Sequence, residues 1–414
     1  MKTSAVRLYG KNDLRLEHFE LPPTKDDEIL AKVVSDCICM SSHKAALQGA
    51  EHKRVPADVA DNPTILGHEF SGEIIEAGAK WRQDFGPGQK YAIQPALNYK
   101  GSLDAPGYSY RYIGGNATYV VIPNEVMEQN CLLPYSGDAF FYASLSEPMS
   151  CIIGAFHANY HTTAGSYDHE MGIVNGGNMA LLAGAGPMGL GAVDYAIHCA
   201  RRPGLIVVTD IDDERLMRAA QILTVREAAE NGVKLVYINT SGANELIGLT
   251  RGRGYDDVFV FAPVVPVVEL GDKILGRDGC LNFFAGPIDP AFSAPFNFYN
   301  AHYASTHLVG TSGGNTSDMI ESLSMMENGL IDPAAMITHI GGLDCVIDTT
   351  LNLDKIPGGK KLIYTHISMP LTAIAELGST DDPVLQTLAE IVAGNNGLWC
   401  AEAEKHLLSV KCGA

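Results

Sequence analysis

The sequence predicts an α/β protein with two large parts and a small helical C-terminal extension. Residues 1 to about 150 consist of short β-type runs bounded by glycine and proline. From residue 178 onward, an apolar strand, a glycine turn and a helix are followed by more strand-like runs with helical stretches between them. Strands that alternate with helices are typical of a parallel, doubly wound sheet. A chain of 414 residues is long enough to form two hydrophobic cores.

The strand-like runs define these two parts. In the first part, the runs 29–40, 72–78 and 117–123 indicate an irregular, mostly antiparallel β domain. The second part contains 178–200 (strand, turn and helix), the strands 205–210, 234–239, 255–262 and 279–286, and a helix over 213–223. Residues 154–177 predict a helix start followed by a loop or short insertion, and 310–330 predict a strand that leads into a helix. The tail has helical spacing, and the sequence leaves its purpose open.

The charge balance and cysteine content narrow the function class. The formal net charge is -19, which disfavours nucleic acid and anionic membranes as partners. An anionic substrate would therefore need a local cluster of cations. The sequence contains no apolar run of membrane-spanning length and no apolar segment near its start, so we expect neither a transmembrane helix nor a signal peptide. The nine scattered cysteines are expected to be thiols in a cytoplasmic protein, with a few as metal ligands.

A glycine-rich turn predicts a nucleotide site of the Rossmann type. The turn consists of Gly184, Gly186, Pro187, Met188 and Gly189. It follows an apolar strand and opens a helix, which is the context that the G-x-G-x-x-G pattern requires. The second glycine lets the backbone approach a pyrophosphate, and the helix N-terminus offers free N–H groups to it. Asp210 ends the next strand, where an acid binds the adenosine ribose and repels a 2′-phosphate, so this position favours NAD.

Four residues in the first part have the chemistry of an open zinc site. Cys39, His68, Glu69 and Glu147 supply a thiolate, an imidazole and carboxylates, which leave one position for water or substrate in a catalytic site. Each residue also has a structural explanation: a core thiol, a satisfied interior histidine or an acid at a helix start. No C-x-x-C pair fixes the site by spacing. The acidic ligand is therefore left open between Glu69 and Glu147.

These motifs together resemble the zinc-dependent medium-chain dehydrogenases/reductases. The stretch G-H-E-x-x-G-x5-G at 67–78, the Cys39-Met40-Ser41 step, Glu147-Pro148 and GAGPMG at 184–189 carry the resemblance. It implies a GroES-like catalytic domain, a Rossmann domain and a return of the chain to the catalytic domain. The limits expected on this basis are 1–152 for the first catalytic part, 153–312 for the Rossmann domain, 313–367 for the return and 368–414 for the extension. A homodimer or homotetramer is implied as well.

The resemblance also implies roles for individual residues. Cys39 and His68 match zinc ligands, Glu69 matches the acid that binds zinc in polyol-type members, and Glu147 matches a ligand that binds directly or through water. Ser41 matches the hydroxyl of the proton relay. The chain departs from the family at two places. Residues 95–115 lack the cysteines of a structural zinc loop, so we expect a single zinc, and Lys44, next to His43, occupies a relay position usually held by histidine.

A narrower likeness concerns the substrate. The runs CMSSHK, GTSGGNTSDMIES (310–322) and IPGGKKLIYTHI (356–367) resemble the L-sorbose 1-phosphate reductases. This implies reduction of a ketose phosphate to a hexitol phosphate with NADPH, which conflicts with Asp210 unless Arg215 lies near the ribose. Lys44, Lys100 and Arg111 are candidates for binding the phosphate, although each is equally explained as a solvated charge.

Two alternatives remain open. One is a sorbitol- or threonine-type dehydrogenase that acts on an unphosphorylated polyol or secondary alcohol. The other is a non-catalytic nucleotide-binding relative, which would keep the glycine turn without the metal ligands.

Overall fold

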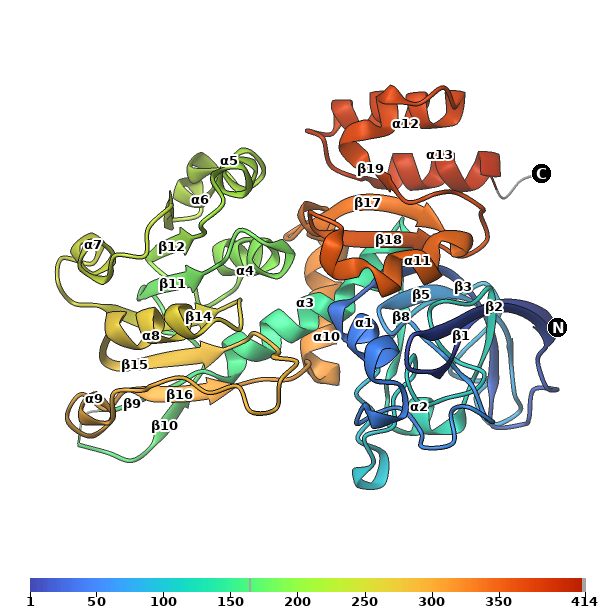
Figure 1. Cartoon of the computed structure of the whole chain (residues 1–414), viewed down its shortest axis with the longest axis horizontal. Helices are drawn as coiled ribbons and strands as arrows, with labels where there is room; N and C mark the ends of the chain where they lie inside the picture. The colour runs from blue at the N-terminus through green and yellow to red at the C-terminus, as the bar shows by residue number, and fades with distance from the viewer. Residues whose placement is uncertain (164, 412–414) are drawn as a thin grey trace. The chain divides into compact units, whose positions relative to one another are not determined.

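The computed structural model describes residues 1–163 and 165–411 and divides into two compact units (Figure 1). The first unit is formed by Met1–Pro148, Asn315–Gly329 and Ile337–Ala414, and the second by Met149–Gly314 and Leu330–Met336. The chain thus leaves the first unit after Pro148, returns to it at Asn315, and enters the second unit once more at Leu330–Met336 before its final return. The limits predicted at residues 152, 312 and 367 remain our proposal for the functional domains.

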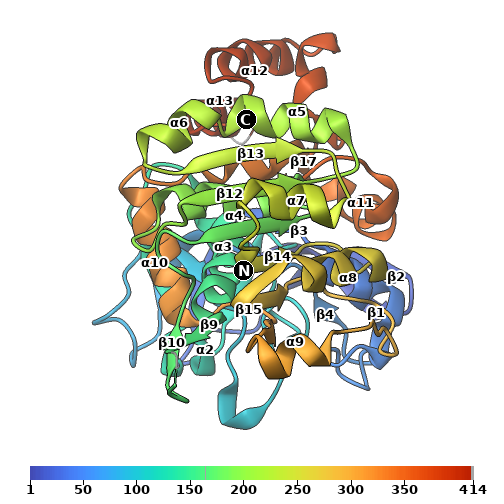
Figure 2. The ribbon, with the colours of Figure 1, turned by 90° about the vertical axis from the view of Figure 1, so that its left-hand side faces the viewer.

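The second unit contains a six-stranded sheet in the order β13-β12-β11-β14-β15-β16 (Figures 1 and 2). Every neighbouring pair in it is parallel. The strands are β11 (Asn178–Leu182), β12 (Leu205–Thr209), β13 (Lys234–Ile238), β14 (Tyr255–Val260), β15 (Leu275–Phe283) and β16 (His307–Gly310). The connecting helices are α4 (Pro187–His198), α5 (Asp213–Ile222), α6 (Val225–Glu230), α7 (Ala243–Leu249), α8 (Val265–Ile274) and α9 (Phe298–Tyr303). The predicted doubly wound sheet is confirmed.

Side chains on both faces of this sheet are buried. On one face, Val258 and Val260 of β14 belong to a cluster with Leu246 of α7 and Val268 of α8. On the other face, Phe259 stacks on Phe156 with ring centroids 4.7 Å apart. Successive residues of a strand point to opposite faces, so burial of all three positions requires cover on both sides. This explains why the strand sequences are continuous apolar runs.

The first unit is built mainly from antiparallel strands. A large sheet has the order β19-β17-β18-β3-β5-β6-β8, with β7 paired to β3, and a smaller one has the order β2-β1-β4. The strands are β1 (Lys2–Gly10), β2 (Asp13–Glu20), β3 (Ile29–Ile38), β4 (Thr64–Ile65), β5 (Phe70–Ala77), β6 (Lys90–Ile93), β7 (Tyr119–Ile122), β8 (Leu132–Tyr135), β17 (Ile337–Gly342), β18 (Lys360–Tyr364) and β19 (Thr372–Ala373). The helices are α1 (Met40–Gln48), α2 (Asn124–Glu128), α10 (Thr316–Glu327), α11 (Val346–Leu351), α12 (Pro383–Gly394) and α13 (Ala401–Lys411), while α3 (Phe140–Ala158) contributes residues to both units.

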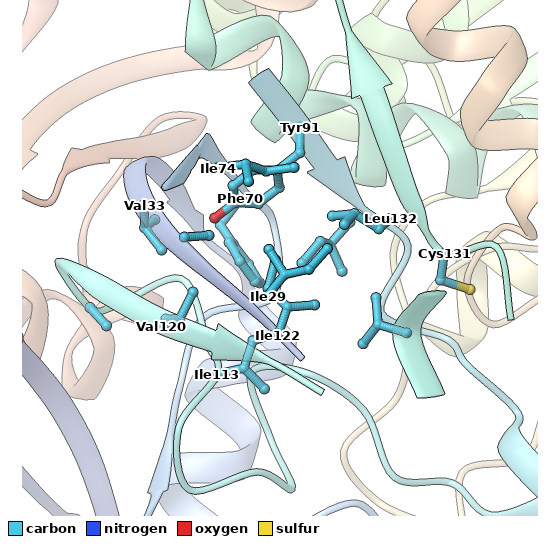
Figure 3. Packing of buried hydrophobic residues seen from close by; sticks show 14 of the residues in the cluster. Ile29, Val33, Phe70, Ile74, Tyr91, Ile113, Val120, Ile122, Cys131 and Leu132 are labelled. Carbon is cyan, nitrogen blue, oxygen red and sulfur yellow. The ribbon is translucent and has the colours of Figure 1, made fainter. Parts of the chain in front are cut away.

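The core of the first unit lies against β3 and β5 (Figure 3). Ile29, Ala31 and Val33 alternate along β3 and are fully buried. Phe70 of β5 meets Tyr91 of β6 edge to face, with ring centroids 6.3 Å apart. The core therefore anchors the two strands whose ends carry the candidate metal ligands.

One element between the two parts differs from its prediction. Residues 154–158 form the last turn of α3, which begins at Phe140, and do not start a helix. The helix begins earlier because Phe141, Leu145 and Met149 recur at helical spacing and are fully buried. The loop expected next is a hairpin of β9 (Tyr160–Thr162) and β10 (His169–Met171).

The C-terminal extension is helical, as predicted. It adds β19 to the edge of the large sheet beside β17, and then forms α12 and α13. Leu388 of α12, Trp399 and Leu407 of α13 are completely buried. The extension is thus packed into the first unit. Among the described residues, no helix is long and apolar enough to cross a bilayer.

Candidate metal and substrate site

Three predicted ligands come together in the first unit. Cys39 follows β3 and caps the N-terminus of α1, while His68 and Glu69 directly precede β5. Since β3 pairs with β5 up to Asp36 opposite Phe70, the ends of the two strands lie side by side. One candidate ligand atom each from Cys39, His68 and Glu69 lies within 4.8 Å of the other two. Strand pairing thus brings these residues together, although Cys39 is far from His68 and Glu69 in the sequence.

Gly67 sets the path of the backbone into this group. Its φ is +94°, a conformation that favours glycine. A Cβ at this position would lie 2.7 Å from the backbone nitrogen of Asn116 and 2.8 Å from Oδ2 of Asp36. The backbone can therefore bring His68 and Glu69 into the site only if residue 67 has no side chain.

The imidazole of His68 is buried and held at both nitrogens. Nδ1 lies 3.2 Å from the hydroxyl of Ser42 on α1, and Nε2 lies 3.3 Å from the hydroxyl of Tyr108. Burial lowers the pKa of His68, and the charges of Glu147 and Glu69 oppose this shift. The side chain is therefore neutral near pH 7, as a metal-binding histidine must be.

Glu69 is a buried carboxylate with one partnered and one unpartnered oxygen. Its Oε1 accepts a hydrogen bond from the ammonium of Lys360 on β18. Its Oε2 is buried and has no hydrogen-bond partner among the described residues. Burial raises the pKa of Glu69, and Lys360 opposes this shift. An unsatisfied acceptor next to a thiol and an imidazole fits a divalent cation.

The hydroxyl of Ser41 lies at the same site, whereas His43 is used elsewhere. The backbone N–H of Ser41 points to Sγ of Cys39 at 3.5 Å, and its side chain hydrogen-bonds Tyr108. Nδ1 of the buried His43 lies 2.7 Å from the carbonyl oxygen of Thr350. This contact ties His43 to the backbone of α11.

Glu147 is buried near this group but lies outside it. The residue sits in the middle of α3, so the explanation as a helix-start acid is wrong. Its charge raises the pKa of His68, which places the carboxylate within electrostatic reach of the imidazole. The set of ligand atoms within 4.8 Å contains Glu69 and not Glu147.

In the second unit, the glycine turn has the geometry expected for a nucleotide. Gly186 caps α4 without a side-chain hydrogen bond, and a Cβ on it would meet nothing within 4 Å, so the backbone there is open to a ligand. A Cβ on Gly189 would lie 2.0 Å from the carbonyl oxygen of Gly184, so the third glycine permits the close turn. Asp210 accepts from the N–H of Ala185 at 3.2 Å.

Arg215, expected near the ribose, pairs with an acid. Its Nε lies 3.4 Å from Oδ2 of Asp212. Asp212 also caps α5, accepting from the backbone N–H groups of Glu214 and Arg215. The charge of the Arg215 guanidinium is therefore already compensated by Asp212, the residue that caps α5.

Two of the predicted phosphate-binding cations contact aromatic rings. Lys100 lies 4.6 Å from the ring centroid of Tyr99, and Arg111 lies 5.6 Å from that of Tyr112. For Lys44, burial lowers the pKa and the charge of Cys39 opposes this shift, so Lys44 lies within electrostatic reach of Cys39.

Sequence reasoning missed several residues at the site, namely Ser42, Tyr108 and Lys360. Lys360 carried the clearest signal, since a lysine in the apolar strand KKLIY needs a buried counter-charge. Tyr108 lies in an irregular segment without periodicity, so its position could not be inferred.

The chain belongs to the zinc-dependent medium-chain dehydrogenase/reductase family, and it is an oxidoreductase of the alcohol and polyol dehydrogenase type. Residues 25–131 match the alcohol dehydrogenase GroES-like domain. The chain is 51% identical to mannitol-1-phosphate 5-dehydrogenase from Aliivibrio fischeri, over 98% of this chain and 97% of the relative. It is also 51% identical to L-sorbose 1-phosphate reductase from Klebsiella pneumoniae, over the same shares of each chain.

A solved structure shares the fold at lower identity. The 2R,3R-butanediol dehydrogenase from Bacillus subtilis superimposes with a TM-score of 0.69 at 21% identity, covering 87% of this chain and 99% of that one. Together with the GroES-like match, this confirms the predicted pairing of a GroES-like and a Rossmann domain.

Proposed function

We propose that this chain transfers hydride between a nicotinamide cofactor and a ketose phosphate, with L-sorbose 1-phosphate and D-glucitol 6-phosphate as the substrate pair. The observation that carries the proposal is the buried group of Cys39, His68 and Glu69, with its unsatisfied carboxylate oxygen. The near-full-length identity to L-sorbose 1-phosphate reductase supports the choice of substrate.

The donor set fits a catalytic zinc held by Cys39, His68 and Glu69. A zinc ion bound there would act as a Lewis acid on the oxygen of the ketone. Glu147 is assigned to the same site as a nearby acid and not as a direct ligand, because it lies outside the set of close ligand atoms. We propose this zinc as the only one in the chain.

The protein's own side chains prepare this site. The hydroxyl of Ser42 contacts Nδ1 of His68 and orients the ring, so that Nε2, which faces the hydroxyl of Tyr108, would be the atom that binds the metal. Lys360 compensates the buried charge of Glu69 through its ammonium. Burial lowers the pKa of Lys360, but Glu69 and the cysteines outweigh burial and raise it, so the ammonium keeps its charge. The ligands are thus oriented before substrate binds.

Ser41 and Tyr108 are assigned to proton transfer. They are hydrogen-bonded to each other, and the hydroxyl of Tyr108 lies 3.3 Å from Nε2 of His68. Burial raises the pKa of Tyr108 well above its usual value, so this hydroxyl remains a donor at neutral pH. Ser41 is less buried than Tyr108 and gives the alcohol proton a way to solvent.

The nicotinamide cofactor is assigned to the glycine turn and the N-terminus of α4. Asp210 favours NAD at the ribose, whereas likeness to the sorbose phosphate reductases favours NADP. We place the enzyme in the cytoplasm, because the cysteines that the structure describes form no disulfide bonds. We also propose that it is a homo-oligomer.

Initial-rate measurements test the proposal. L-sorbose 1-phosphate, fructose 1-phosphate and free sorbitol are compared, each with both nicotinamide cofactors. The phosphate esters are expected to give the higher kcat/KM. Equal turnover of free sorbitol would favour a sorbitol-type dehydrogenase instead.

Metal analysis tests the zinc assignment independently of activity. The purified chain is expected to contain a single zinc, and Cys39→Ser is expected to lose it. Glu147→Gln should retain the metal if Glu69 is the acidic ligand. A wild-type chain that binds no zinc would refute the assignment.

A further inference from the structure

A group of cations lies beside the candidate metal site. The guanidinium carbon of Arg54 lies 5.7 Å from the ring centroid of Tyr108, whose hydroxyl is 3.3 Å from Nε2 of His68. The charge of Arg54 acts on both His68 and Tyr108. Lys53 directly precedes Arg54 in the sequence, and its charge acts on Lys44. A single aromatic ring thus separates this group from His68.

We propose that Arg54, together with Lys53 and Lys44, forms the subsite that binds the phosphate group of the substrate. The inference rests on the proposed function, because it assigns the group that distinguishes a ketose phosphate from a free ketose. Guanidinium and ammonium groups are the side chains that bind phosphate oxygens most strongly.

Two cations of this subsite, Lys53 and Arg54, are not neutralised by nearby acids. In the described ranges, neither Lys53 nor Arg54 has a carboxylate oxygen within 4.0 Å of its side-chain nitrogens. The acidic residues of the same segment are engaged elsewhere: Glu51 pairs with Lys11 at 2.5 Å, and Asp58 accepts from the amide of Asn62 at 2.6 Å. In a chain with a net charge of -19, this gathering leaves positive charge for an anionic ligand.

His52 completes the subsite as a neutral hydrogen-bond donor. Its ring stacks on Tyr108 with centroids 5.6 Å apart and an interplanar angle of 11°. Burial, together with the charges of Lys53 and Arg54, lowers the pKa of His52 to about 4, so the ring is neutral at pH 7. Its Nδ1 accepts from the backbone N–H of Arg54 at 3.3 Å. The proton therefore resides on Nε2, which can donate to a phosphate oxygen.

The backbone of this segment is fixed in place. The carbonyl oxygen of Arg54 accepts from the hydroxyl of Ser109 at 2.6 Å, and the N–H of Val55 bonds the carbonyl oxygen of His52 at 2.9 Å. Because Ser109 is adjacent to Tyr108, the same contacts hold the cation and the ring that separates it from His68. Such fixed placement reduces the entropy lost on binding.

The test compares Arg54→Gln and Lys53→Gln with wild type on L-sorbose 1-phosphate and on free L-sorbose. Arg82→Gln is the matched control, because it removes the same charge from an exposed arginine of the same unit. For Arg54→Gln, the ratio of kcat/KM for the phosphate to that for the free sugar is expected to fall about 10- to 100-fold. Lys53→Gln should give a smaller fall, and Arg82→Gln should leave the ratio within about twofold of wild type.

The cofactor is the other possible source of phosphate at this site. If Arg54 binds NADP instead, Arg54→Gln will raise the KM for NADPH relative to NADH and leave the sugar preference unchanged, which overturns the inference. If wild type itself shows no preference for the phosphate ester, the proposed function fails. If wild type has the preference and both variants keep it, only the subsite is wrong.

A binding measurement separates the subsite from a folding defect. Calorimetric titration of the zinc-loaded wild type with D-glucitol 6-phosphate is expected to show binding that Arg54→Gln weakens about 10- to 100-fold. Arg54→Lys keeps the charge and should recover part of the loss. Equal affinity in wild type and Arg54→Gln would refute the subsite. If Arg54→Gln fails to fold, the same comparison with Lys53→Gln decides.

Discussion

The buried carboxylate of Glu404 is predicted to tie the C-terminal extension to the helix that carries Glu147. It accepts from the backbone N–H groups of Phe140 and Phe141 at 2.6 and 2.9 Å, and from the hydroxyl of Tyr364 at 2.9 Å. Phe140 and Phe141 begin α3, so a side chain of the extension satisfies N–H groups that a helix start leaves without partners. The extension thereby fixes the N-terminus of α3.

Glu404→Ala removes all three of these acceptor interactions. A hydrogen bond to a charged group contributes about 1.5–3 kcal/mol, and buried donors left without a partner add to the loss. We expect the first unit to lose about 3–6 kcal/mol in its free energy of unfolding, measured by urea denaturation. Glu402→Ala, an exposed acid on the same helix, is the control. A loss for Glu404→Ala within about 0.5 kcal/mol of that control would refute the reasoning.

The pH dependence gives a second, independent measurement. Burial raises the pKa of Glu404 from its usual 4.5 to about 7, although its hydrogen-bond donors and Lys90 oppose the shift. The folded chain then binds more protons than the unfolded chain between these values, so stability falls as pH rises through this window. Across this window, the shifted pKa of Glu404 changes the free energy of unfolding by about 3 kcal/mol. Glu404→Gln should remove this component, and parallel stability curves for wild type and variant between pH 5 and 7.5 would contradict it.

Three further changes test the site. Lys360→Met leaves Glu69 buried without its counter-charge, so the free energy of unfolding of the zinc-free chain should fall by about 3–5 kcal/mol. The zinc-loaded chain should lose less, and equal losses in urea denaturation would contradict this. Gly67→Ala should lower the free energy of unfolding by at least about 2–3 kcal/mol, because φ at this position is positive and a Cβ would meet the backbone. Gly86→Ala is the control and should cost little, since its Cβ would have nothing within 4 Å. Similar melting temperatures for the two variants would contradict this account of the backbone. Asp210→Gly should raise the ratio of kcat/KM for NADPH over NADH about tenfold or more, and an unchanged ratio would remove Asp210 from the ribose site.

The sequence by itself determined the class of fold and the nucleotide turn. Parallel strands buried on both faces are continuous apolar runs, and a glycine turn must follow its strand directly, so both are local patterns that the chain order displays. The one helix start that was misplaced, at residue 154, shows the limit of this approach. There the helix begins at Phe140 and continues through Pro148, because its apolar positions keep helical spacing and are buried.

Only the tertiary structure decided which acid joins Cys39 and His68. Glu69 and Glu147 are both candidates in the sequence, and pairing between β3 and β5 places a carboxylate oxygen of Glu69 within 4.8 Å of the candidate ligand atoms of Cys39 and His68. The counter-charge on Glu69 comes from Lys360, which lies 291 positions further along the chain. Spacing along a sequence cannot encode such contacts, because they arise from strand pairing and burial across the sheet.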